Sequence, residues 1–374
     1  MIHSSLLASS GGNVFSSLLQ GVAPEGVPIW AISLGAAFLG VGILVAFVSL
    51  VAMFSVWLER KVSAHIQCRY GPMYVGGWHG WAQTIADGVK LLLKEDLIPL
   101  GADRPLFMLA PAIVLGAIFG ALVALPLAPG FFFADVDMGL FLILAFSSLT
   151  TIGVVMAGWA SNSKWSLYGA MREAAQVVAY EIPLGVSLFV PLMVAGTFSL
   201  TEASAAQSGW FGMHWFIFQN PFMLPAFIIF FIAALAETKR APFDLPEAES
   251  ELVAGFMTEY SGIRWSFFFM EEYAAMFLMS AVGTIFFFGG YHSPLTAMFP
   301  ESATSGVLYQ LVCAGTIIVK SFAGVFVMMW LRWTLPRMRI DQVMSMGYKY
   351  LTPLALACVL GAAIWETIFT GDSL

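Results

Sequence analysis

The sequence predicts an all-α protein that crosses a membrane several times, and three features support this fold class. First, 59% of its 374 residues are hydrophobic and only 10% are charged, whereas soluble domains carry about 25% charged residues. Second, long apolar runs recur along the chain. Third, the positive charges are gathered in alternate connections between those runs. Residues 1–374 are therefore expected to form a single membrane domain.

Eight apolar runs are long enough to cross the hydrocarbon core of a bilayer, which takes about 20 helical residues. They cover approximately residues 29–58, 106–128, 139–160, 174–199, 220–237, 265–290, 306–331 and 350–370. The first run is longer than a perpendicular crossing requires, so it predicts a helix that is tilted or that extends beyond the membrane.

The positive charges orient these eight helices. Fifteen of the 16 Lys and Arg residues lie in or beside four connections, whereas both termini and the other three connections contain none. Because cations mark the inner side of a membrane, both termini are expected on the outer side, which is the periplasmic side if the membrane is a bacterial inner membrane. The fifteen cations are Arg60, Lys61, Arg69, Lys90, Lys94, Arg104, Lys164, Arg172, Lys239, Arg240, Arg264, Arg332, Arg337, Arg339 and Lys349.

The first inner connection, residues 59–105, contains the pattern of an amphipathic surface helix. Apolar residues recur at helical spacing, and polar residues fall on the opposite face. The apolar positions are Trp81, Ile85, Val89 and Leu92, and the polar positions are Gln83, Asp87, Lys90 and Lys94. Such a helix ordinarily rests on lipid headgroups, but here it could also wall an entrance for a lipid-like molecule.

Several classes of site are not expected. Cys68, Cys313 and Cys358 are far apart in sequence, so they offer neither zinc spacing nor the thiolates of an iron–sulfur cluster. No pair of histidines lies inside the predicted spans for haem, and no glycine-rich nucleotide motif is present. The net charge of −7 argues against nucleic-acid binding. We therefore expect no metal, haem, flavin or iron–sulfur cluster in this chain.

Carboxylates occur inside the predicted spans, where an ionised side chain costs roughly 2.5–3.5 kcal/mol at the helix centre. They could pair with inner-side cations as packing contacts, or they could line a hydrated path for protons. Because several lie at a similar membrane depth, we favour the proton path. These carboxylates are Glu181, Glu237, Glu271 and Glu272.

A dense acidic stretch follows Lys239 and Arg240, in the inner connection 238–264. Glu247 and Glu251 are four residues apart and would share one face of a helix. Carboxylates this close repel one another, so at least one is expected to titrate at a higher pH, unless the stretch is simply solvated. The acidic residues are Asp244, Glu247, Glu249, Glu251 and Glu259.

Lys320 is the sixteenth cation, and it lies near the middle of the seventh predicted span. A buried lysine needs a carboxylate partner or must lose its charge. The sequence names no partner for it.

Four segments together resemble the H subunit family of bacterial respiratory complex I, the counterpart of subunit 1 of the mitochondrial enzyme. They are residues 59–95, 158–181, 236–262 and 331–349, and each begins or ends at an inner-side span boundary. The third, AETKRAPFDLPEAESELVAGFMTEYSG, is the most specific.

The resemblance implies a membrane-arm subunit of a proton-translocating NADH:quinone oxidoreductase, without a redox centre of its own. It would form most of a chamber that admits quinone as a bound substrate, and it would begin the proton path toward the antiporter-like subunits. Its partners would be the quinone-site subunits of the hydrophilic arm, small membrane-arm subunits, lipid and quinone.

The resemblance also implies roles for particular residues, none of them catalytic. The quinone chamber and its junction with the path would use Glu59, Arg60, Arg69, Asp87, Arg240, Asp244, Glu247, Glu249 and Glu251. The proton path would use Glu181, Glu237, Glu259 and Glu272, and we add Lys320 because of its depth.

Two positions depart from the family pattern. Lys239 stands where an asparagine is usual, and Glu271 stands where a small residue is usual. Lys239 could pair with an acid of its own connection. We expect Glu271 to point about 100° away from Glu272 and so off the face that lines the path.

Two other functions remain open at this point. The chain could be the matching membrane subunit of an energy-converting hydrogenase, which need not contain a quinone chamber. It could also be a secondary transporter, although such proteins have inverted repeats and interrupted helices that we do not find here.

Overall fold

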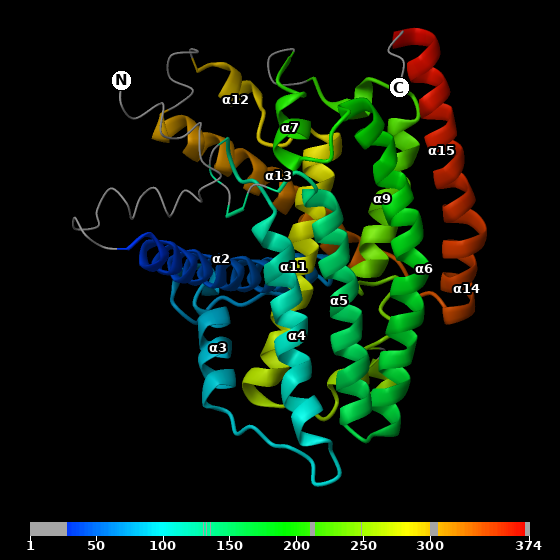
Figure 1. The fold of residues 1–374 in the computed structure, drawn as a ribbon. Helices are drawn as coiled ribbons and strands as arrows, with labels where there is room; N and C mark the ends of the chain where they lie inside the picture. Colours follow the sequence, from blue (N-terminus) through cyan, green and yellow to red (C-terminus); the bar gives the residue numbers. More distant parts are fainter. Residues whose placement is uncertain are drawn as a thin grey trace.

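The structure, a computed structural model, describes residues 28–370 except 130, 132, 135, 210–213, 248 and 300–305. This part of the chain is helical, apart from one isolated bridge between Ala128 and Phe131. Long helices lie side by side along much of the molecule, and helix α2 runs across them at a steep angle (Figure 1).

Seven helices of the described part are long and apolar enough to cross a membrane. This confirms an all-helical, multi-pass fold. The seven are α2 (Ile29–Ile66), α4 (Arg104–Val123), α5 (Gly139–Ala160), α6 (Lys164–Ala195), α11 (Gly262–Phe287), α13 (Val307–Thr334) and the continuous helix Ile340–Phe369. This last helix comprises α14 (Ile340–Ser345), η5 (Met346–Leu351) and α15 (Thr352–Trp365), and it continues into η6 (Glu366–Thr370).

Shorter elements connect them. They are η1 (Trp78–Gly80), α3 (Gln83–Leu93), α7 (Leu200–Ala205), η2 (Phe216–Phe218), α9 (Met223–Glu237), α10 (Glu249–Leu252), η3 (Gly255–Met257) and α12 (Pro294–Ala297). Residues 238–261, between α9 and α11, are called the acidic loop below.

The fifth predicted span, 220–237, corresponds to α9, which has only 15 residues. At 1.5 Å per residue it is about 22 Å long, shorter than the hydrocarbon core of about 30 Å. Helix α9 is nevertheless an interior helix that packs against α6, α11 and α15. The predicted count of eight spans therefore depends on α9.

Helix α6 begins at Lys164, ten residues before the predicted fourth span, 174–199. Charged residues in this first part of the helix lower its hydropathy, so the apolar run that identifies the span begins only after them. Two of them are held by partners, since Arg172 pairs with Glu251 at 2.6 Å and Glu173 pairs with Lys239 at 2.7 Å. Glu181 lies 17 residues after the start of α6.

Helices α4, α5 and α6 approach one another closely because small residues line their contacts (Figure 1). A Cβ atom on Gly153 would lie 2.5 Å from the side chain of Val114, and one on Gly158 would lie 2.4 Å from that of Ala170. Small residues are how helices pack tightly in lipid, where no hydrophobic force drives them together. These three helices form a rigid wall beside α11.

Helix α11 is the central helix of the molecule. It packs against α2, α4, α9 and α13, and nearly all of its residues from Glu271 to Phe287 are buried. A helix that is apolar on all sides is expected in such a position. Its two carboxylates, Glu271 and Glu272, therefore point into protein rather than into lipid or water.

The predicted surface helix is present as α3. Its apolar side chains are not covered by the rest of the chain, since Ile85, Val89 and Leu92 remain 43%, 48% and 66% exposed. This face is free to contact lipid or another molecule.

The acidic loop turns back on itself through residues with left-handed backbone conformations. Val253 has φ of 66° and Gly255 has φ of 54°. A Cβ atom on Gly255 would lie 1.8 Å from the carbonyl oxygen of Pro246, so only glycine fits there. The loop also packs directly on α6, because a Cβ on Gly169 would lie 2.7 Å from the backbone nitrogen of Phe256.

We predict that Gly255→Ala destabilises the protein. The left-handed backbone alone costs a non-glycine residue about 1–3 kcal/mol, and the contact with Pro246 adds to this. The fraction of chain that stays soluble in a heated detergent extract of membranes, measured by immunoblot, should fall at a lower temperature than in the wild type.

The control is Gly185→Ala in α6, where the added Cβ meets no atom within 4 Å. Alanine favours a helix interior over glycine by up to about 1 kcal/mol, so this variant should be at least as stable as the wild type. If the two variants behave alike, the acidic loop does not depend on Gly255.

Candidate functional site

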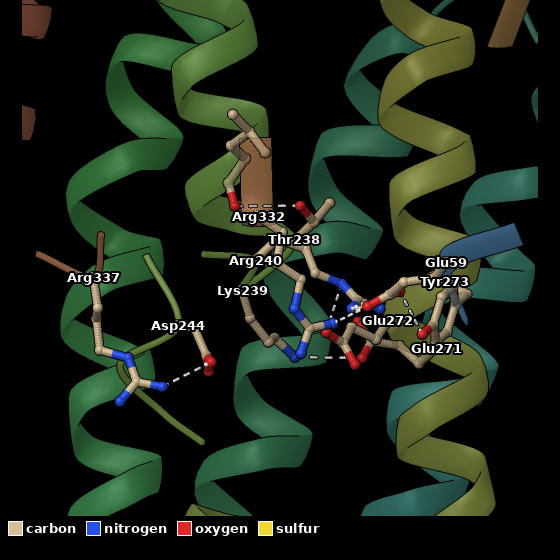
Figure 2. A network of polar contacts seen from close by, with 11 residues as sticks. Glu59, Thr238, Lys239, Arg240, Asp244, Glu271, Glu272, Tyr273, Arg332 and Arg337 are labelled. Carbon is tan, nitrogen blue, oxygen red and sulfur yellow. Dashed lines mark hydrogen bonds and ion pairs between the residues drawn. The ribbon is translucent and has the colours of Figure 1, made fainter. Parts of the chain in front are cut away.

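Charged side chains from five parts of the chain meet beside the central helix α11. Arg240 of the acidic loop is only 3% exposed and lies between two carboxylates of different helices. Its Nη1 is 3.2 Å from Oε2 of Glu59 in α2, and its Nε is 2.9 Å from Oε1 of Glu272 in α11. Its guanidinium also lies 4.3 Å from the ring centre of Tyr273. Figure 2 shows these groups pointing toward one another.

Glu59 accepts three contacts, and each comes from a different element. Besides Arg240, the hydroxyl of Tyr273 donates to it at 2.7 Å, and Arg332 at the end of α13 donates to its other oxygen. One carboxylate therefore joins α2, α11, α13 and the acidic loop.

Lys239, next to Arg240, forms ion pairs with a second group of carboxylates. Its Nζ is 2.7 Å from Glu173 of α6 and 3.3 Å from Glu271 of α11. Both partners therefore lie outside the connection that contains Lys239. The adjacent residues Glu271 and Glu272 do point in different directions, but both are buried, and they are divided between Lys239 and Arg240.

These seven residues are called the charge cluster. They are Glu59, Glu173, Lys239, Arg240, Glu271, Glu272 and Arg332. Four carboxylates face three cations, so one negative charge is in excess when every carboxyl group is ionised. Buried charge without a partner is costly, which favours one proton bound somewhere in the group. The charge cluster thus has the composition of a site that can take up and release a proton.

Glu237 lies at the end of α9, two residues before Lys239. It is buried, and neither of its oxygens accepts a well-formed hydrogen bond from the described residues. Its neighbours include Ser147 of α5, Glu181 of α6 and Glu271 of α11. Glu237 therefore connects the charge cluster with Glu181, which is half-buried beside Ser148.

Two hydrogen bonds hold α6 against this region. The side-chain amide of Gln176 donates to the carbonyl of Ala236 at 2.7 Å, and the hydroxyl of Tyr180 donates to the carbonyl of Val343 at 3.0 Å. Together with Glu173, these residues recur at i, i+3 and i+7 and mark one polar face of α6.

The acidic loop contributes further carboxylates near the charge cluster. Burial raises the pKa of Asp244, although Arg337 at 3.0 Å opposes the shift. Burial also raises the pKa of Glu247 well above its usual value, and the nearby Glu272 and Asp244 add to the effect. At least one acid of the stretch therefore holds its proton to a higher pH, as close carboxylates are expected to do.

Glu251 behaves differently, because a hydrogen bond from Arg172 holds its pKa below the usual value. The prediction that Glu247 and Glu251 share a helix face is wrong, since α10 begins only at residue 249. The side chain of Glu249 lies outside the described residues. Glu259 is partly exposed and has no hydrogen bond or ion pair within the part of the chain that is described.

Two predicted cations lie toward the surface. Arg60 pairs with Asp87 of α3 at 2.6 Å, which fastens the surface helix to the end of α2. Arg69 is exposed and donates only to the side chain of Gln67, at 2.6 Å. It does not reach the charge cluster.

Lys320 contacts backbone oxygens instead of a carboxylate. Its Nζ donates to the carbonyls of Phe288, Gly290 and His292 at 2.7, 3.1 and 2.6 Å. A cation at the C-terminal end of a helix, here α11, is favourable because the last carbonyls carry partial negative charge. The Lys320 side chain also borders an apolar cavity of about 450 Å³ between α9, α11 and α13.

Sequence reasoning missed three members of this site: Glu173, Tyr273 and Arg332. The polar periodicity of Glu173, Gln176 and Tyr180 could have revealed the first. Nothing in the sequence indicates that Arg332 contacts Glu59, 273 residues away. Among the described residues, no three His, Cys, Asp or Glu side chains come together as a metal ion would require.

Comparison with known proteins relates most of the chain to one family. A family model described as NADH dehydrogenase matches residues 39–363. The H subunit of NADH-quinone oxidoreductase from Chlorobium luteolum is 45% identical over 365 residues, which cover 96% of this chain and 95% of the relative. The same protein from a Geobacillus species is 47% identical over 333 residues, 89% of this chain and 95% of the relative. That of Anaeromyxobacter dehalogenans is 43% identical over 349 residues, covering 91% and 83%.

We predict that Glu59→Gln destabilises the assembled protein, because it leaves Arg240 and Arg332 without their shared carboxylate. Removing one partner of a buried ion pair costs about 3–5 kcal/mol. The amount of chain recovered from native membranes, and its resistance to heating in detergent, should both fall.

The exposed pair Arg60–Asp87 provides the comparison, since the side chains are 42% and 26% exposed. Asp87→Asn should change the thermal stability by no more than about 1 kcal/mol. Equal losses in the two variants would mean that the charge cluster contributes no more than a surface pair.

Proposed function

The chain belongs to the NADH dehydrogenase family, as an H subunit of NADH-quinone oxidoreductase, and we propose that it lines the quinone chamber and begins the proton path of that enzyme. On this proposal the acidic loop and the inner end of α2 face the quinone headgroup. Reduction of the quinone would change the charge near the buried carboxylates beside α11, and these carboxylates would pass protons on. The chain itself carries no electrons.

The observation that carries this proposal is a series of neighbouring carboxylates, with Glu272 of α11 and Glu237 of α9 buried and Glu181 of α6 half-buried. Both Glu181 and Glu271 of α11 lie close enough to Glu237 to interact with it. A succession of acids inside a membrane bundle is costly unless it serves the passage of ions or protons. The excess of one carboxylate over the cations of the charge cluster supports proton passage, since it allows one mobile proton.

Glu237 has the surroundings that a proton carrier needs. It is buried, its oxygens accept no well-formed hydrogen bond from the described residues, and it lies between the charge cluster and Glu181. A group with a fixed cation partner would remain ionised, whereas an unpaired carboxyl group can gain and lose a proton as its neighbours change charge. The serines of α5 beside Glu237 and Glu181 would help water molecules to bridge the gap.

The surface around α3 suits the access of an apolar molecule from the bilayer. The apolar face of α3 is exposed, and the Arg60–Asp87 pair fastens this helix beside the end of α2. A quinone sliding between α3 and the acidic loop would meet Glu59 and Arg240 at the boundary between lipid and the charge cluster. Glu247 and Asp244 would line the same junction.

The arrangement of the helix ends supports eight spans with both termini outside. The ends of α2, α9 and α13 that are predicted on the inner side meet in the charge cluster through Glu59, Lys239 and Arg332. For α9 to count as a crossing helix, the residues around it must complete the passage, namely η2 on one side and the turn at 238–240 on the other. In this orientation the cation-rich face would dock the other subunits of the enzyme.

We predict that Glu237→Gln uncouples or stops proton pumping, because the amide keeps the size of the side chain but cannot ionise. Acidification of inverted membrane vesicles, driven by NADH and followed with a pH-sensitive dye, should fall by at least about tenfold. Glu181→Gln should have the same effect. Assembly of the complex, measured on native gels, should remain.

Glu202→Gln is the matched control, because Glu202 of α7 is exposed and its side chain accepts a hydrogen bond from Thr197, away from the charge cluster. It should pump normally. If vesicles with Glu237→Gln acidify as fast as the wild type while quinone reduction is intact, Glu237 is not part of the path.

A further inference from the structure

We propose that Lys239 is a resident counter-ion shared by Glu173 and Glu271 and that it thereby tunes the pH at which the neighbouring path carboxylates exchange protons. It is a positioning residue, since it acts through other groups and does not itself carry the proton. This inference rests on the proposed function in one respect, namely that Glu237 and Glu272 belong to the proton path.

The contacts of Lys239 are those of a fixed charge in the interior. Its Nζ is 2.7 Å from Glu173 and 3.3 Å from Glu271, and none of the three side chains is more than 4% exposed. The ring centre of Phe256 lies 5.6 Å from the same nitrogen. Glu173 and Glu271 come from different helices, so Lys239 is the group that allows both to be buried together.

The backbone at this cation has an uncommon conformation. Lys239 has φ of 57°, a left-handed conformation that a residue with a Cβ rarely adopts. The turn directly follows α9, so Lys239 and Arg240 are consecutive residues that reach separate pairs of carboxylates. Strain of this kind persists only where surrounding contacts hold it, and here the two ion pairs do so.

The balance of charge locates the excess carboxylate of the charge cluster. Arg240 and Arg332 face Glu59 and Glu272, and the nearby Glu247, whose pKa burial raises, adds no charge while it holds its proton, so that half is balanced. Lys239 alone faces both Glu173 and Glu271, so the unbalanced negative charge lies in its half. Glu237 adds a third carboxyl group there, and the charges of Glu181 and Glu272 are also close enough to interact.

The effect of Lys239 on the path follows from this balance. A nearby cation makes a carboxyl group easier to ionise, and a nearby anion makes it harder. With Lys239 present, Glu173 and Glu271 share one cation within ion-pair distance, and Glu237 lies beside the pair. Without it, three buried carboxyl groups would share one space with no cation, and they would hold their protons to a higher pH.

A role confined to packing makes a different prediction from this electrostatic role. If Lys239 and Glu271 only held the helices together, removing either would lower stability in the same direction. If they set the local charge, removing the cation and removing the anion must shift the pH dependence of pumping in opposite directions. The sign of the two shifts therefore separates the alternatives.

The test measures the pH profile of NADH-driven acidification in inverted vesicles that contain the assembled complex. Lys239→Met should move the pH of half-maximal pumping upward, and Glu271→Gln should move it downward, each by about one pH unit. The double variant should return to within about half a unit of the wild type, because the two charge changes cancel. Arg264→Met, which breaks the Arg264–Asp96 pair outside the charge cluster, is the control and should leave the profile unchanged.

Glu271→Gln decides the matter even where Lys239→Met fails to assemble, since it preserves shape and leaves Lys239 paired with Glu173. An unchanged profile in Glu271→Gln, or shifts of the same sign in both single variants, overturns the inference. Glu237→Gln separates this result from the proposed function. If Glu237→Gln abolishes pumping while Glu271→Gln has the profile of the wild type, only the role of Lys239 is wrong.

Discussion

The structure depends above all on the burial of Arg240 between Glu59 and Glu272. This guanidinium is almost inaccessible to solvent, and its two carboxylate partners come from α2 and α11, which are far apart in the sequence. Buried ions are tolerated only when every charge has a partner. The contact therefore forces α2, α11, α13 and the acidic loop into one arrangement (Figure 2), and that arrangement in turn places Lys239 against α6.

The same constraint explains why the polar residues are concentrated in one region. A helix bundle in lipid gains nothing from hydrophobic association between its helices, so small-residue packing and buried polar contacts must hold it together. Helices α4, α5 and α6 use small residues, as at Gly153 and Gly158. The inner ends of α2, α9 and α13 use ion pairs instead. A region that is held by charge can respond to a change of charge, whereas one held by close packing cannot.

Sequence reasoning succeeded where the information is local. The approximate span 139–160 coincides with helix α5 (Gly139–Ala160), because the apolar run there is uninterrupted. Glu181, Glu237 and Glu272 were recognised because a carboxylate in an apolar run stands out, and the family was recognised from motifs. The start of α6 was missed because hydropathy treats Arg172 and Glu173 as if no partner existed. Which cation meets which acid could not be read either, since Glu59 and Arg240 are 181 residues apart and meet only in the folded chain.

The two positions that depart from the family pattern, Lys239 and Glu271, have a joint explanation in the folded protein. Taken singly, each adds a buried charge, which is among the costliest changes in a membrane interior. Taken together they form an ion pair with each other, and Glu173 completes the group. The arrangement places a cation two residues from Glu237. With a neutral side chain at that position, only water would offset the charge of the buried carboxylates. In the proposed proton path, the pH at which the carboxylates exchange protons would then be set by the Lys239 side chain rather than by bound water.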